Sequence, residues 1–75
     1  TSLRITAEDR GGLVMDVATV LNSLNAKVRN LNARAIAGGV AAVNIIMEVR
    51  DLTALNQIIA RIRGIRGVQE IRRGS

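Results

Sequence analysis

The spacing of apolar residues switches between a period of two and a helical period, and this alternation limits the possible folds more than any other feature. Residues 2–8 alternate between apolar and polar side chains, which indicates a half-buried strand. Asp9–Gly12 contains two glycines and indicates a turn. From Leu13 the apolar side chains recur every three or four positions, which predicts a helix from about Gly12 to about Leu24.

The middle of the chain predicts a β-hairpin. Residues 27–37 are strand-like, and a bulge between Val28 and Leu31 would let both of these side chains reach the core. Gly38-Gly39 follows, and a pair of glycines between two strand-like segments is a strong signal for a tight turn. Residues 40–49 then form the most apolar of the predicted strands.

The last third of the chain repeats the order of helix and strand. Asp51 is a good N-cap, because its carboxylate can accept the free amide hydrogens of the first helical turn. An apolar stripe from Leu52 to Ile62 predicts the second helix, and Gly64 is placed to end it. Residues 68–73 are typical of a short fourth strand with a basic end.

The predicted order is strand–helix–strand–strand–helix–strand over the whole chain. Two similar βαβ halves with right-handed crossovers form a four-stranded antiparallel sheet with both helices on one face. We therefore predict an α+β, ferredoxin-like βαββαβ fold in one domain of residues 1–75. The other face of the sheet must meet water or a partner. On the third strand that face carries Ala42, Asn44 and Ile46, through which we expect a weak homodimer.

The composition excludes several functions that this fold class can perform. The sequence contains no Cys, no His and no aromatic residue. RNA-recognition domains stack bases on aromatic side chains, heavy-metal carriers and ferredoxins need Cys, and Ser-His-Asp catalysis needs His. We therefore expect no catalysis, metal or cofactor in this chain. No segment approaches the roughly 20 apolar residues that cross a bilayer, so we expect no membrane contact and a cytoplasmic location.

The chain is strongly basic. Eleven Lys and Arg residues against six Asp and Glu residues give a net charge of +5, which suits contact with nucleic-acid phosphates. The arginines that could contact RNA lie towards the end of the sequence: Arg61, Arg63, Arg66, Arg72 and Arg73. The alternative is a solvated surface that is rich in arginine. Salt separates the two, because each phosphate contact weakens with salt by about 0.7–0.9 log units per decade.

The loop between the first strand and the first helix is the clearest candidate for a binding site. Gly11 and Gly12 allow a ligand to approach the backbone closely. The helix that follows begins with free amide hydrogens and the positive end of its dipole, which can hold the carboxylate of a small molecule. The alternative is that the two glycines serve only a tight turn.

The same segments resemble a known family. Residues 5–17, Ile-Thr-Ala-Glu-Asp-Arg-Gly-Gly-Leu-Val-Met-Asp-Val, are similar to the opening signature of ACT domains. Residues 32–34, 46–52 and 62–73 are similar to the version of that domain in RelA/SpoT enzymes, which typically closes with a basic pair. The resemblance covers essentially the whole chain, and it rests on the order and spacing of these segments taken together.

This resemblance implies a regulatory domain cut from the C-terminal end of a long multidomain protein. The parent would be a GTP pyrophosphokinase, which transfers pyrophosphate from ATP to GTP or GDP and often hydrolyses the product, in the stringent response to amino-acid starvation. Its active sites would lie in N-terminal domains, so this fragment would have no activity of its own. The implied partners are the other parent domains, a small ligand such as an amino acid, and the ribosome and tRNA.

The resemblance also implies which residues form the ligand loop: Asp9, Arg10, Gly11, Gly12, Leu13 and Val14. One position departs from the family. Many amino-acid-binding ACT domains carry Asn just before the first apolar residue of the second strand, whereas Lys27 stands before Val28 here. The Lys27 ammonium could still meet a carboxylate, so we include it among the expected ligand-binding residues. ACT domains commonly pair, and their ligands often lie between the paired domains.

Overall fold

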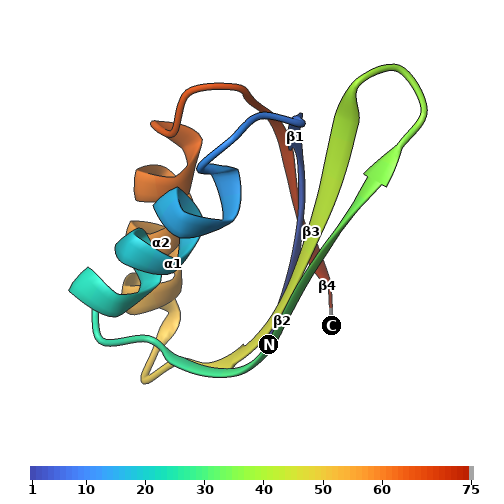
Figure 1. The fold of residues 1–75 in the computed structure, drawn as a ribbon. Helices are drawn as coiled ribbons and strands as arrows, with labels where there is room; N and C mark the ends of the chain where they lie inside the picture. Colours follow the sequence, from blue (N-terminus) through green and yellow to red (C-terminus); the bar gives the residue numbers. More distant parts are fainter. Residues whose placement is uncertain (75) are drawn as a thin grey trace.

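The computed structural model describes residues 1–74, which form one layer of sheet and one layer of helices (Figure 1). The elements follow in the order β1 (Ser2–Glu8), α1 (Leu13–Ser23), β2 (Lys27–Ile36), β3 (Val40–Glu48), α2 (Leu52–Arg63) and β4 (Val68–Gly74). Neighbouring strands are antiparallel, in the order β2-β3-β1-β4. Both helices lie on the same face of the sheet. The predicted ferredoxin-like βαββαβ fold is confirmed.

The two helices begin in different ways. The carboxylate of Asp51 accepts a hydrogen bond from the amide of Ala54 at 2.8 Å, so the predicted N-cap of α2 is confirmed. Helix α1 instead follows Gly12, which has a left-handed φ of 85°, and no side chain caps its first turn. The start of α1 therefore leaves amide hydrogens available at the surface.

A bulge shifts the pairing of β2 with β3 between Val28 and Asn30, as predicted. Val28 and Leu31 consequently both occupy positions on the helix side of the sheet. Val28 nevertheless stays 41% exposed, because β2 is the edge strand and the helices cover it only in part. A second shift, between Thr6 and Ala7, interrupts the pairing of β1 with β4.

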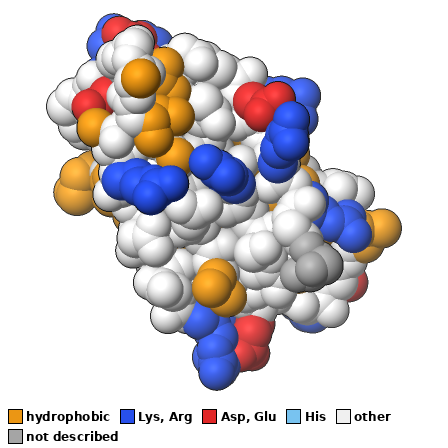
Figure 2. Space-filling model, turned by 90° about the vertical axis from the view of Figure 1, so that its right-hand side faces the viewer, with side chains coloured by type: hydrophobic (Ala, Val, Ile, Leu, Met, Phe, Trp, Pro, Cys, Tyr) orange, Lys and Arg blue, Asp and Glu red, His pale blue; other side chains and the backbone are white. Residues whose placement is uncertain are grey.

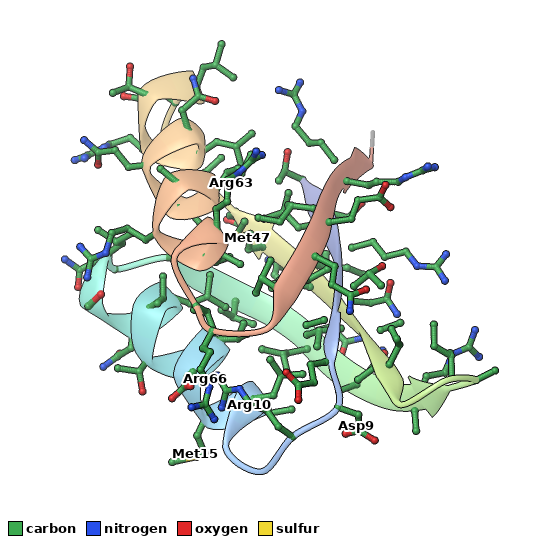
Figure 3. All side chains as sticks on the ribbon, turned by 90° about the horizontal axis from the view of Figure 1, so that it is seen from above. Asp9, Arg10, Met15, Met47, Arg63 and Arg66 are labelled. Carbon is green, nitrogen blue, oxygen red and sulfur yellow. The ribbon has the colours of Figure 1, made fainter. Side chains whose placement is uncertain are left out.

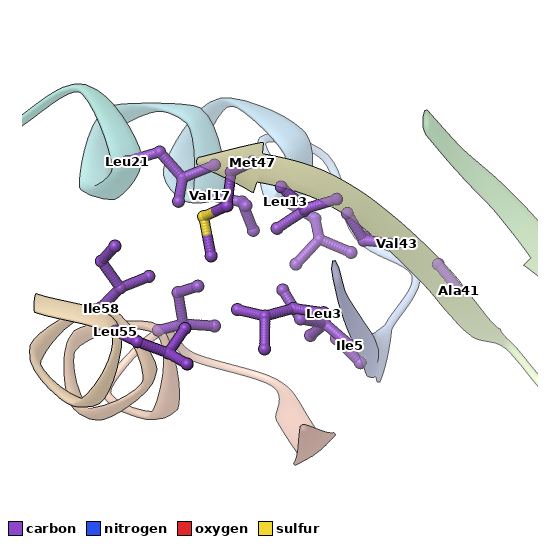
Figure 4. Packing of buried hydrophobic residues seen from close by; sticks show 13 residues of the cluster. Leu3, Ile5, Leu13, Val17, Leu21, Ala41, Val43, Met47, Leu55 and Ile58 are labelled. Carbon is purple, nitrogen blue, oxygen red and sulfur yellow. The ribbon is translucent and has the colours of Figure 1, made fainter. Parts of the chain in front are cut away.

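The sheet and the two helices bury one apolar core (Figure 4). Its largest fully buried side chains are Leu3, Ile5, Val17, Leu21, Val43, Ile45, Met47, Ile58 and Ile62. Burial of each side chain of this size stabilises the fold by about 1.5–3 kcal/mol. Among residues 1–74 no polar or charged residue is buried with them. Polar groups capable of binding or chemistry must therefore be sought at the surface.

The helices cover only part of the sheet. The β2–β3 hairpin extends well past α1, so its helix-facing side is open near the Gly38-Gly39 turn (Figure 1). Along β2 only Leu31 is half-buried, and the other nine residues are exposed. A strand that is exposed on both faces and along one edge offers surface to a ligand or to a second protein.

Candidate functional site

A groove of about 240 Å³ lies between the loop Asp9–Gly12, the start of α1 and the open side of the hairpin. Its lining includes most of the predicted ligand loop: Asp9, Arg10, Gly12, Leu13 and Val14. The remaining lining residues are Met15, Ala33, Arg34, Ala35 and Ala41. Gly11 belongs to the same loop but lies outside the groove. The groove thus has two walls. One is the loop that the sequence indicated, and the other consists of residues of β2 and β3.

Lys27 lies away from this groove. It is the first residue of β2 and pairs with Glu48, whereas the groove begins at Ala33 on the same strand. A strand rises about 3.3 Å per residue, so Lys27 is roughly 20 Å from Ala33 along β2. A contact between Lys27 and a ligand in the groove would therefore need a second chain.

Arg10 holds the loop in place through three hydrogen bonds. Its Nε donates to the backbone carbonyl of Arg66 at 3.0 Å, and its Nη1 donates to the carbonyl of Gly11 at 3.1 Å. Its Nη2 forms an ion pair with Asp16 at 2.7 Å. The side chain of Arg10 is only 14% exposed, and Figure 3 shows it beside Arg66 and near Met15. Arg10 therefore ties the β1–α1 loop to the α2–β4 loop, and two of its five N–H donors remain for a ligand.

Backbone contacts fix the loop on the hairpin side as well. The amide of Asp9 donates to the carbonyl of Gly39 at 2.9 Å, which joins the end of β1 to the hairpin turn. The amide of Glu8 donates to the carbonyl of Gly67 at 2.9 Å on the opposite side. The loop is thus fastened to three parts of the fold before any ligand binds, which lowers the entropy cost of binding.

The start of α1 supplies the polar end of the groove. Gly12 takes the left-handed conformation that an L side chain rarely adopts, and a Cβ there would lie 3.6 Å from Arg10 Nη1. Beyond Gly12 the first-turn amides of Val14 and Met15, which both line the groove, belong to the positive end of the helix dipole. An anionic group is stabilised at such a position.

The rest of the groove is apolar, and this part could not be located from the sequence. Val14 is 40% exposed and Met15 is 71% exposed, because both lie on the side of α1 that faces away from its buried stripe of Leu13, Val17 and Leu21. Ala33 and Ala35 lie on the helix side of β2, where their small side chains leave space. The signal that could have revealed them is a hairpin longer than the helix packed against it. The groove suits a small ligand with an apolar body and an anionic group.

The arginines that were expected to contact RNA do not form one surface. Arg61 and Arg63 lie in the last turn of α2, and Arg66 follows in the loop. Arg72 and Arg73 are consecutive on β4, so their side chains point to opposite faces of the sheet. Arg72 also pairs with Glu70 at 3.1 Å.

The predicted interface residues do lie on the open face of β3, but they differ in exposure. Ala42 is fully buried beneath its neighbours, Asn44 is half-buried, and Ile46 is 48% exposed. Asn44 Nδ2 donates to Asn32 Oδ1 on β2 at 3.4 Å. Ile46 is therefore the apolar side chain of this set that a partner could cover.

Two further features of the part of the chain that the structure describes bear on function. Neither of its helices is long and apolar enough to cross a membrane. Its acidic side chains also form no group of three or more that could hold a metal ion.

Comparison with known proteins identifies the family. The family model described as ACT domain matches residues 1–73. The crystal structure of the ACT domain from GTP pyrophosphokinase of Chlorobium tepidum superposes with a TM-score of 0.83 at 21% identity, over 95% of this chain and 91% of that chain. The solution structure of the same domain gives a TM-score of 0.82 at 23% identity, over 99% of this chain and 83% of that chain.

A subunit of a different protein has the same fold. The small subunit of acetolactate synthase from Thermotoga maritima superposes with a TM-score of 0.81 at 14% identity, over 95% of this chain and 44% of that chain. No curated protein sequence matches the chain. Identities this low establish a shared fold, and the family model assigns the sequence itself: the chain belongs to the ACT domain family.

Proposed function

We propose that this ACT domain is the C-terminal regulatory domain of a RelA/SpoT-type GTP pyrophosphokinase and relays a starvation signal to distant catalytic domains. ACT domains are regulatory. The RelA/SpoT-like segments 32–34, 46–52 and 62–73 support the choice of parent. The fold shared with the Chlorobium domain supports it too. The observation that carries the proposal is the groove at Asp9–Gly12, where the residues of the family signature meet an uncapped helix.

The ligand of the groove would be a small anion with an apolar portion, such as an amino acid. Its carboxylate would accept hydrogen bonds from the first turn of α1 and from the remaining donors of Arg10. Its side chain would lie against Met15 and the alanines of β2. The groove is shallow within one chain, so a neighbouring domain would complete it.

That neighbour would be a second copy of the domain or another domain of the parent. The helix side of the hairpin and the free edge of β2 are the surfaces it would cover, because both leave apolar groups or backbone hydrogen-bonding groups exposed. Exposed Val14 and Met15 lie in this region. The alternative pairing through Ile46 would bring two copies of a basic sheet face together, and like charges oppose that arrangement.

The test compares two substitutions in the parent protein. Met15→Glu places a charge in the groove, and Gln57→Glu places the same charge on the exposed side of α2. The two substituted parent proteins should synthesise guanosine tetraphosphate at the same unstimulated rate. Only the Met15→Glu protein should lose the change in synthesis or hydrolysis that follows amino-acid starvation. If both respond like the unsubstituted protein, the groove does not carry the signal.

The exposed arginines favour a second candidate function, which is contact with ribosomal RNA or tRNA. Arg61, Arg63 and Arg66 cluster around the end of α2, and no acidic residue in the described chain forms a salt bridge with them. RNA affinity of the parent should then fall steeply with salt, and Arg61→Gln with Arg63→Gln should reduce the slope by about 1.5. An unchanged slope would leave these arginines as solubilising surface.

A further inference from the structure

Polar side chains form a row across the open face of the sheet, on the side away from the helices. Arg4 lies between Leu3 and Ile5, which point into the core, so Arg4 points to the open face. Its partners in the strand register are Asn44 on β3 and Arg72 on β4. Figure 2 shows this side of the molecule, where basic side chains gather across the middle.

The charges in this row are unbalanced. Arg4 and Arg72 are direct cross-strand partners, and like charges at opposed positions destabilise a sheet. Arg72 is partly compensated by its pair with Glu70. Within residues 1–74, Arg4 forms no salt bridge. Glu70 also lies on the open face, where it lines a smaller hollow with Arg4, Thr6 and Arg72, so one acidic side chain faces two arginines and the group keeps a net positive charge.

A hollow of about 440 Å³ lies beside these two arginines. The residues at its open-face positions are Ser2, Arg4, Asn44, Ile46, Arg72 and Gly74. None of the residues that line it is acidic. The position that a side chain at Gly74 would take is occupied by the Ser2 hydroxyl, which closes this end of the hollow. The wall of the hollow is mostly apolar, with guanidinium, amide and hydroxyl groups at its polar positions, and the space is large enough for several non-hydrogen atoms.

The hydrogen-bonding groups in the hollow match a phosphate group. A guanidinium presents paired N–H donors that fit two oxygens of a phosphate, and two adjacent guanidinium groups can share one phosphate or bind two linked ones. Asn44 is already oriented by its hydrogen bond to Asn32. Bound phosphate would also remove the repulsion between Arg4 and Arg72, so the site gains from a doubly charged ligand more than from a carboxylate.

We propose that Arg4, Arg72 and Asn44 form a binding site for phosphate groups, with a pyrophosphate unit as the ligand that fits the hollow. The site is independent of the groove at Asp9–Gly12, which lies on the helix side of the sheet. The phosphates are supplied either by a small pyrophosphorylated molecule or by the backbone of RNA. Both sources use the same donors, and the experiment separates them.

The test is a titration of the ¹⁵N-labelled 75-residue domain with sodium pyrophosphate, followed by NMR at constant ionic strength. Saturable shifts are expected at the amides of Arg4, Asn44 and Arg72. Arg4→Gln should weaken binding at least tenfold. Arg50→Gln removes the same charge from the exposed loop between β3 and α2 and should leave affinity within twofold. Glu70→Gln frees Arg72 and should tighten binding severalfold.

A second titration with a short single-stranded RNA identifies the source. One outcome is that the domain binds RNA, that Arg4→Gln abolishes this binding, and that pyrophosphate has no saturable effect. This outcome supports the site, with the phosphates of the RNA backbone as its ligand. If the domain binds pyrophosphate but not RNA, the result supports the site, with a small pyrophosphorylated molecule as its ligand. If neither binds, or if Arg50→Gln weakens binding as much as Arg4→Gln, the proposal is overturned. Arg72→Gln serves in place of Arg4→Gln if the latter loses its folded NMR spectrum.

Discussion

Replacing Arg10 by Met should destabilise the domain more than the loss of an ordinary surface arginine. Met keeps the apolar stem that packs at the loop, so the change removes mainly the guanidinium. Three contacts disappear with it: the ion pair with Asp16 and the hydrogen bonds to the carbonyls of Arg66 and Gly11. The prediction therefore isolates the role of Arg10 as a tie between two loops.

The expected cost follows from these contacts. Asp16 is 51% exposed, so the ion pair contributes only about 0.5 kcal/mol. Each hydrogen bond contributes about 1 kcal/mol net, and water replaces part of that at accessible carbonyls. The total loss is about 2 kcal/mol, which lowers the Tm of a domain of this size by roughly 10 °C.

Arg29→Met is the matched control. Arg29 pairs with Glu48, but both side chains are more than half exposed, at 59% and 52%. Its loss should change the free energy of unfolding by less than about 0.5 kcal/mol. Urea unfolding followed by circular dichroism measures both variants. Equal destabilisation by Arg10→Met and Arg29→Met would refute the reasoning, because Arg10 would then be one more surface charge.

Four further predictions concern the loop, the core, association and activity. Gly12→Ala should cost about 1 kcal/mol in urea unfolding because of its left-handed φ of 85°, whereas Gly11→Ala, with open space around its Cβ and no positive φ, should be nearly neutral. Ile45→Ala should cost 2–5 kcal/mol, roughly the range for large-to-small core changes, and a cost near zero would contradict the core assignment. Sedimentation equilibrium should show a dimer with a Kd in the micromolar-to-millimolar range. Met15→Lys should abolish this dimer and Ile46→Lys should leave it intact. The reverse result would place the interface on the open face of the sheet. The purified domain should make no guanosine tetraphosphate from ATP and GTP, and turnover by a clean preparation would overturn the regulatory assignment.

The fold could be predicted largely from local signals. Alternation in residues 2–8, the cap at Asp51 and the glycine pair Gly38-Gly39 each act within a few residues of chain. The bulge near Arg29 was also visible, because Val28 and Leu31 are out of phase. These signals are strong here since the chain is short and each element carries its own start or stop.

The groove could be predicted only in part. Two glycines after a strand and before a helix pointed to the loop Asp9–Gly12, of which Asp9, Arg10 and Gly12 line the groove. The other wall of the groove could not be predicted from the sequence, because a strand with alternating alanines has the same pattern whether or not a helix covers it. Ala33 and Ala35 are exposed because α1 is 11 residues long and β2 extends beyond it.

The order of elements, their boundaries and their caps thus follow from the residues themselves, since each depends on neighbours along the chain. Contacts between distant segments depend instead on how strands align and how far a helix reaches. Arg10 meets the carbonyl of Arg66, 56 residues away, only after both loops are placed by the core. Arg4 faces Arg72 because of the register between β1 and β4, and a shift of one residue would send either side chain to the other face.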